Sequence, residues 1–350
     1  MAGKYISLRY GRFSQLIDKK VVRVNIVLIF LFLIVAIISL GLGDYVIHPF
    51  DALKAVFGMG DAMQNLVVRN FRMPRIVLAA LAGMALAISG AILQGLVRNP
   101  LASPDIIGVT DGAALATVGF LALFNTSDNA MTVSIEWLPL ASFLGALGVA
   151  WLVHALAKKG YSAVRLVLIG TGIAALAKAL TQFLMVTGPI YLASRANIWI
   201  TGSVNGAKWN QDILLLVWFV FFFTVSLWLA RRLNAHELGE GVAAGIGVAL
   251  RGDRTLLIIA ATALAGGAVA FSGGIRFVGL MAPHMARRLV GSGHGALLPT
   301  SALFGGIIVM ISDLAGRMLF LPLEIPAGVF TSAIGAPYFI YLLYKSRGGK

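Results

Sequence analysis

Few residues in this 350-residue chain have the types and spacing that enzymatic chemistry requires. The chain contains no cysteine, which excludes disulfides, thiolate metal ligands and cysteine nucleophiles. His236 and Glu237 begin like the zinc-protease motif HExxH, but no second histidine follows at the required position. No GxxxxGK[ST] phosphate-binding loop and no GxSxG nucleophile motif occurs. We therefore expect a protein that is not an enzyme, with no catalytic residue, no metal site and no cofactor.

The residues that stand out chemically are ionisable side chains inside apolar segments. Lys178 lies about 20 Å along its predicted helix from Arg165, at a rise of 1.5 Å per residue. A charge at that depth in a bilayer is costly and usually faces the protein interior or a water-filled cavity. The sequence offers Asp313 as its ion-pair partner, and a structural pair and a role in transport both stay open. For Asp111, two interpretations stay open: it lines a transport path, or it caps the N-terminus of another apolar helix, and the cap is preferred.

The elements that must position these side chains are membrane-spanning helices. Hydrophobic residues make up 59% of the chain and charged residues only 12%, whereas soluble domains carry about 25% charged residues. The net charge of +14 could suggest nucleic-acid binding. However, the basic residues form short clusters at the ends of apolar runs, which is typical of positive-inside membrane topology.

A helix needs about 20 apolar residues to cross the hydrocarbon core, and nine apolar runs are obvious candidates. A tenth crossing is needed so that the basic clusters at 158–165, 231–254 and 345–350 share the side of the N-terminus. We assign it to a short half-helix after a re-entrant loop, whose backbone must be shielded by protein or by a water-filled cavity. The predicted helices are 24–42, 75–97 (starting near Met63), 105–124, 137–157, 164–187, 211–230, 255–271, 279–290, 298–320 and 328–344.

The sequence therefore predicts an all-α integral membrane protein with ten transmembrane helices in a single domain. The basic segment 1–23 and the tail 345–350 are expected to be cytoplasmic, and 24–344 forms the membrane domain. No small-residue cleavage site clearly follows the first apolar run. That run is therefore interpreted as a retained helix rather than a signal peptide.

Five short motifs punctuate the apolar runs, and each by itself is explained by turns, helix ends and interfacial charges. Together, in this order and spacing, they resemble the FecCD (BtuC-like) family. This is the permease family of binding-protein-dependent importers for iron-siderophores, haem and vitamin B12. The resemblance runs from about Val24 to the C-terminus. The motifs are RMPR (72–75), SGAILQ (89–94), RNPLASP (98–104), FVGLMAPH (277–284), and LEIPAG (323–328) followed by GAP (335–337).

This resemblance implies the fold of a type II ABC importer permease and assigns roles to matching positions. Arg72 and Arg317 match the arginines that dock the extracytoplasmic substrate-binding protein, a role suited to the fixed donor fork of arginine. The segment of about 236–250 matches the region that couples the permease to the ATPase, with Glu240, Gly245 and Gly247 fitting the pattern. Two cytoplasmic ATP-binding subunits and a second permease subunit are the other implied partners, and a heterodimer is favoured over a homodimer.

The expected function is that of the permease subunit of an ABC importer in the bacterial cytoplasmic membrane. It would translocate a ferric siderophore, driven by ATP hydrolysis in the partner. A haem or cobalamin importer is the alternative within the family. A gradient-driven secondary transporter is less favoured, because it would need several intramembrane carboxylates or inverted repeats. An intramembrane protease using His284 lacks an accompanying serine motif.

Overall fold

Long helices dominate the structure, a computed structural model that describes residues 5–10, 13–124, 132–157, 163–188, 190–245 and 250–347. Among the described residues, eight helical segments are long and apolar enough to cross a membrane. The helices that form them are α1 (Lys19–Gly41), α4 (Met73–Val97), α6 (Leu138–Ala157), α7 (Ala163–Thr187), α9 (Trp209–Glu237), α11 (Leu250–Ser272), α13 (His294–Met318) and α14 (Ala327–Arg347).

Two shorter helices, α5 (Val109–Leu123) and α12 (Val278–Val290), complete the predicted set. Each of the ten predicted segments thus coincides with a helix of the described chain. At 1.5 Å per residue, α5 and α12 are each about 20 Å long, which is less than the ~30 Å of a hydrocarbon core. Each of them is therefore shorter than a full membrane span.

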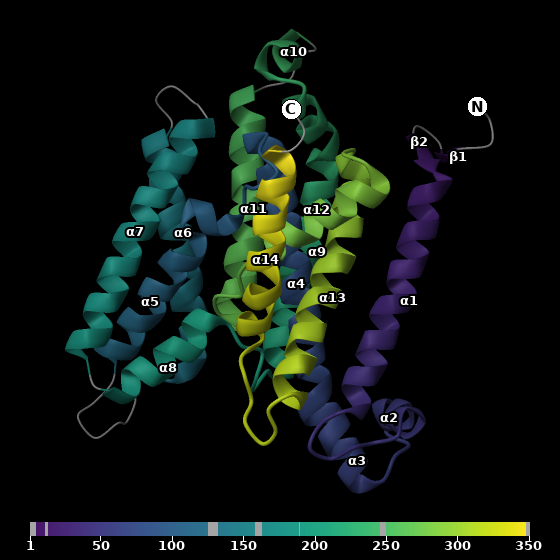
Figure 1. The fold of residues 1–350 in the computed structure, drawn as a ribbon, viewed down its shortest axis with the longest axis vertical. Coiled ribbons are helices and arrows are strands. Elements are labelled where there is room, and N and C mark those ends of the chain that lie inside the picture. The colour runs from purple at the N-terminus through teal and green to yellow at the C-terminus, as the bar shows by residue number, and fades with distance from the viewer. Residues whose placement is uncertain are drawn as a thin grey trace.

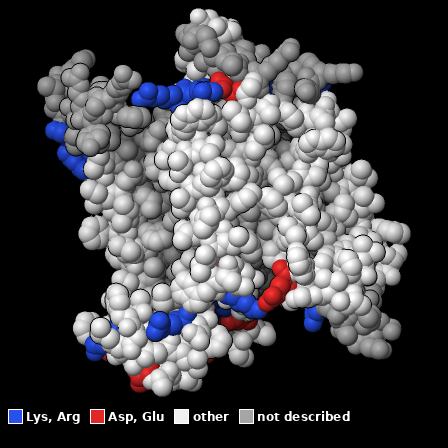
Figure 2. Space-filling view, turned by 180° about the vertical axis from the view of Figure 1, so that it is seen from behind, with Lys and Arg blue, Asp and Glu red and all other residues white. Residues whose placement is uncertain are grey.

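The two ends of the bundle carry different short helices. The short helix α10 (Glu240–Gly245) lies at one end, and α2 (Pro49–Val56) and α3 (Ala62–Leu66) lie at the other (Figure 1). We call these the α10 end and the α2–α3 end. Seen from behind, a broad band without charged residues separates Lys, Arg, Asp and Glu near the two ends (Figure 2). The chain is a multi-pass membrane protein.

Several elements were not predicted. The basic segment 1–23 contains a small antiparallel hairpin. The helix α1 begins within this segment at Lys19, where the Asp18 side chain accepts a hydrogen bond from the backbone N–H of Lys20 at 2.8 Å. The helix α8 (Ile190–Thr201) was missed because its 12 residues include Arg195 and Asn197 and do not resemble a span. The other short elements are β1 (Tyr5–Tyr10), β2 (Phe13–Asp18), the π-helical η1 (Val67–Arg72), and the single turns η2 (Pro104–Ile107) and η3 (Ile135–Trp137).

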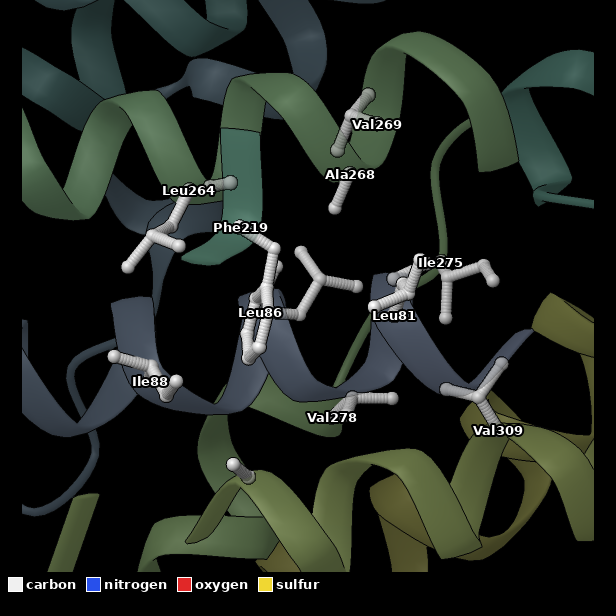
Figure 3. Packing of buried hydrophobic residues seen from close by; sticks show 14 of the residues in the cluster. Leu81, Leu86, Ile88, Phe219, Leu264, Ala268, Val269, Ile275, Val278 and Val309 are labelled. Atoms are coloured by element: carbon white, nitrogen blue, oxygen red, sulfur yellow. The ribbon is translucent and has the colours of Figure 1, made fainter. Parts of the chain in front are cut away.

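The helix α4 forms the centre of the bundle and is almost completely buried. It packs against α9, α11, α12 and α13, whose apolar side chains meet those of α4 (Figure 3). Its closest contact with α13 is glycine on glycine: a methyl group added at Gly83 would overlap the carbonyl oxygen of Gly305. A similar contact joins Gly90 to the carbonyl of Gly279 in α12. Small residues here allow the backbones to approach closely, as is common between membrane helices.

The predicted re-entrant loop and half-helix are both present. The backbone leaves α11 at Ser272 and runs without helical structure to Phe277, the N-cap of α12. Gly273 and Phe277 have left-handed φ angles of 66° and 67°. The loop is shielded by protein, because the Gly274 N–H donates to the Trp199 carbonyl at 3.0 Å. This pairing satisfies the requirement that non-helical backbone in a membrane be covered.

Candidate functional site

A network of arginines and carboxylates joins α4 to α13 near the α2–α3 end. Arg75 donates from Nε to Asp313 Oδ1 at 2.9 Å, and its Nη2 lies 2.9 Å from the same oxygen. Its Nη1 reaches Glu324 Oε2 at 2.9 Å. Arg317 adds a second cation, with its Nε 3.4 Å from Asp313 Oδ2. The Asp313 side chain is 3% exposed, so its charge is compensated entirely by buried guanidinium groups.

The two arginines predicted to dock the binding protein are buried in this structure. Arg72 and Arg317 are each 6% exposed. Arg72 donates to the carbonyls of Leu40 (2.6 Å), Gly41 (3.1 Å) and Tyr45. The docking role of Arg72 and Arg317 therefore stays a prediction, and in the single chain both guanidinium groups are hydrogen-bonded to the end of α1. The end of α1 folds over them, because its last carbonyls have no partners within the helix.

Arg317 bonds to the same end of α1. Its Nη2 donates to Ser39 Oγ at 2.6 Å and to the Ser39 carbonyl at 3.2 Å, and its Nη1 donates to the Leu42 carbonyl at 3.4 Å. Both arginines thus hold the chain segment 39–45, which leads from α1 to the surface helices α2 and α3. Arg72, the last residue of η1, thus connects this segment to the start of α4, and Arg317 connects it to α13.

A second charged cluster lies inside the bundle, and it corrects the predicted pairing of Lys178. Lys178 pairs with Asp111, with Nζ 3.7 Å from Oδ2, and not with Asp313. The pairing with Asp313 was wrong because α7 packs against α5 whereas α13 packs against α4. Arg276, in the loop before α12, donates from Nη2 to Asp111 Oδ1 at 3.2 Å.

Asp111 is therefore an ion-pair partner and not the helix cap that the sequence suggested. It lies in the first turn of α5, but the N-terminus of that helix has no side-chain cap. One turn earlier, Asp105 accepts a hydrogen bond from Thr110 Oγ1 at 2.7 Å. Arg276 and Asp105 are the members of this cluster that sequence reasoning missed. A signal was available, since an arginine beside a predicted half-helix at membrane depth requires a partner.

The predicted coupling region lies at the α10 end. Glu240 is the first residue and Gly245 the last residue of α10, which connects α9 to α11. Gly247 lies outside the described residues. The helix α11 in turn packs along α4 and α6.

A cavity of about 490 Å³ adjoins the arginine–carboxylate network at the α2–α3 end. Its polar lining includes Arg75 and Glu324 from the network, Arg195 from α8, and Asn205 from the loop before α9. Trp199 and Phe271 are among its apolar lining residues. The cavity thus lies where α4, α5, α8 and α11 come together near the α2–α3 end.

Comparison with known proteins identifies the family. The profile of the FecCD transport family matches residues 31–345. The chain belongs to the FecCD transport family.

Relatives of this FecCD chain cover nearly its whole length. It is 51% identical over 98% of its length to a Bacillus subtilis protein named as a siderophore transport system permease, YfhA, of which it covers 99%. It is 45% identical over 97% of its length to the achromobactin transport system permease CbrC of Dickeya dadantii, covering 96% of it. The solved structure of an inward-facing ABC transporter of the metal-chelate type matches with a TM-score of 0.82 at 33% identity, over 92% of this chain and 99% of that one.

These matches confirm the family and the all-helical permease fold that the sequence motifs indicated. In the FecCD chain the motifs RMPR and LEIPAG supply both sides of one network, because Arg75 and Glu324 are ion-paired across 249 residues of sequence. FVGLMAPH contains the left-handed Phe277 and the start of α12. The motifs therefore mark the places where helices stop, turn or approach each other, and not a set of reactive groups.

Proposed function

We propose that this chain is the permease subunit of an ABC importer that carries a ferric siderophore across the bacterial cytoplasmic membrane. The observation that supports this most is the near full-length similarity to permeases named for siderophores. Other relatives are named for iron(3+)-hydroxamate and for Fe(3+) dicitrate. Because the sequence has no phosphate-binding loop, ATP hydrolysis belongs to a separate partner, and this chain is a transport subunit and not an enzyme.

The two ends of the bundle suit different partners. We assign the α10 end to the cytoplasm, together with residues 1–23 and 345–350, and the coupling region 236–250 to two ATP-binding subunits. Glu240, Gly245 and Gly247 would contact the ATPase, and its closure would push α10 against α9 and α11. We assign the α2–α3 end to the extracytoplasmic side, where the substrate-binding protein docks.

Docking at the α2–α3 end would use Arg72 and Arg317 in one of two ways. Either the segment 39–45 moves aside and the arginines pair with acidic residues of the binding protein, or the arginines hold that segment in the shape that the binding protein contacts. The hydrogen bonds from both arginines to this segment support the second way. In both cases docking at this end is mechanically connected to α4 and α13.

A second permease subunit would complete the channel, and we favour a similar but different chain. In the single chain, α7 and α14 expose large apolar residues, among them Leu168, Leu176, Ile334 and Ile340. These faces are where we expect the partner permease. The resulting pathway between subunits would alternate between outward and inward access as the ATPase closes and opens.

The direct test is uptake of labelled ferric siderophores, haem and cobalamin by cells with and without this gene, at low external concentration. Gene-dependent uptake of a ferric siderophore is the expected result. If only the uptake of haem or of cobalamin depends on the gene, the chain is still an importer permease but its cargo is that ligand. Uptake of all these ligands independent of the gene, in a strain lacking related importers, would refute the proposal.

A further inference from the structure

The two short helices α5 and α12 begin beside each other within the bundle, and charged residues lie near the place where they begin. The non-helical segment before α12 lies against the first turn of α5: a methyl group added at Gly274 would lie 3.3 Å from Cγ2 of Thr110. Lys178 on α7 is about 14 Å along its helix from Thr187, so it too lies within the span of the bundle. Three separate elements thus bring ionisable groups to one place at membrane depth.

Cations and anions of this cluster differ in their exposure. The side chain of Lys178 is 57% exposed and that of Arg276 is 35% exposed, whereas that of Asp111 is only 5% exposed. Asp105 accepts the hydroxyl of Thr110 and is partly buried. Although two cations and two carboxylates balance in number, the accessible part of the cluster is positively charged.

The arrangement explains how cations can be kept at this depth. An unpaired charge within a membrane is costly. Asp111 compensates Lys178 at 3.7 Å and Arg276 at 3.2 Å, and it does so from the buried side. Both cations have N–H groups that do not face Asp111, since an ammonium has three and a guanidinium has five, although the Nε of Arg276 is buried.

We propose that Lys178 and Arg276 form an anion-recognising step in the translocation pathway, and that the cargo is a ferric chelate with net negative charge, such as one with free carboxylates. This inference rests on the proposed function and specifies its substrate class. Attraction between charges is stronger in surroundings of low dielectric than in water, so two cations suffice to favour an anion over a neutral chelate of similar size. Partial neutralisation by Asp111 keeps the binding weak enough for the cargo to leave, as transport requires.

A purely structural ion cluster predicts something different. If Lys178 only ties α7 to α5, its removal should loosen the bundle and reduce the import of every cargo alike. A cation that recognises the cargo should matter for an anionic chelate and not for a neutral one. The charge of the cargo therefore separates the two roles.

The experiment compares uptake of two labelled ferric chelates, one anionic through free carboxylates and one a neutral trihydroxamate, in cells that carry the wild-type or a variant chain. Lys178→Met removes the charge with little change of length, and Lys178→Arg retains it. Lys208→Met is the matched control. The Lys208 side chain is likewise exposed (60%) and ion-paired, with its Nζ 3.5 Å from Glu136 Oε1, but it lies at the start of α9, away from the cluster. Assembly is checked by the amount of complex and its ATPase activity.

We expect Lys178→Met to lower uptake of the anionic chelate about tenfold and that of the neutral chelate less than twofold, which is the scale of one charge interaction. Lys178→Arg and Lys208→Met should stay within twofold of wild type for both. The inference would be overturned if Lys178→Met lowered the uptake of both chelates equally, or if the wild-type chain imported only the neutral chelate. In either case the proposed importer function would still stand. Absence of gene-dependent uptake of any ferric chelate would instead overturn the proposed function and this inference with it. If Lys178→Met does not assemble, the Lys178→Gln variant serves in its place under the same criteria.

Discussion

Replacing Asp313 by leucine should destabilise the fold strongly, because it would leave two buried cations without their shared anion. The carboxylate is 3% exposed and lies 2.9 Å from Arg75 Nη2 and 3.4 Å from Arg317 Nε. Removing one partner of a buried ion pair costs about 3–5 kcal/mol. Arg75 keeps Glu324, whose side chain is 39% exposed, so we expect the lower end of this range. A loss of about 3 kcal/mol lowers the ratio of folded to unfolded protein more than about a hundredfold.

The assay is the free energy of unfolding of the purified chain in mixed micelles, measured by titration with sodium dodecyl sulfate. Asp51→Asn is the control, since Asp51 forms an exposed pair with Lys54 at 3.2 Å, worth under about 1 kcal/mol. Combining Asp313→Leu with Arg75→Met should cost about 0.5–3 kcal/mol less than the sum of the single changes. If Asp313→Leu costs no more than Asp51→Asn, or if the two network changes simply add, the network does not hold α4 to α13.

Three further predictions concern packing, docking and coupling. Gly83→Ala should destabilise the bundle by about 1–3 kcal/mol in the same titration, because its methyl group overlaps α13, whereas Gly148→Ala, with no atom near the added methyl, should not. Arg72→Gln should weaken docking of the binding protein and also lower the free energy of unfolding, since carbonyls at the end of α1 lose their donor. Docking is measured by a pull-down and stability by the same titration. Weaker docking at unchanged stability would instead mean that Arg72 pairs directly with the binding protein. Glu240→Ala should detach or uncouple the ATPase, which would be seen as lost co-purification of the ATPase or lost uptake of the cargo. Glu136→Gln, at the opposite end, is the control. If Glu240→Ala leaves co-purification and uptake as unchanged as the control does, Glu240 does not belong to the coupling site.

The helices were predictable from the sequence because a membrane imposes a minimum apolar length. Runs such as 24–42 and 211–230 satisfy this requirement without reference to any other part of the chain. The half-helix 279–290 followed from the positions of the basic clusters, which required one more crossing. The helix α8 was missed because it is short, includes polar residues, and is recognisable only from what it packs against.

The partners of the charged residues could not be predicted from the same information. Lys178 and Asp313 were each identified as intramembrane charges that need compensation, yet they were paired with each other wrongly. Which helices are neighbours is decided by packing, such as the contact of Gly83 with Gly305, and no spacing along the sequence reports it. The burial of Arg72 depends likewise on how the end of α1 folds back, which composition does not reveal.

In the proposed function, a ferric siderophore crosses the cytoplasmic membrane through this chain at the expense of ATP hydrolysed by a partner. The most direct measurement is uptake of the labelled siderophore by spheroplasts supplied with the binding protein, with and without this gene, after either a proton ionophore or depletion of ATP. We expect gene-dependent uptake that persists with the ionophore while ATP stays high and stops when ATP is depleted. Uptake that collapses with the proton gradient at undiminished ATP would contradict the account and favour a secondary transporter.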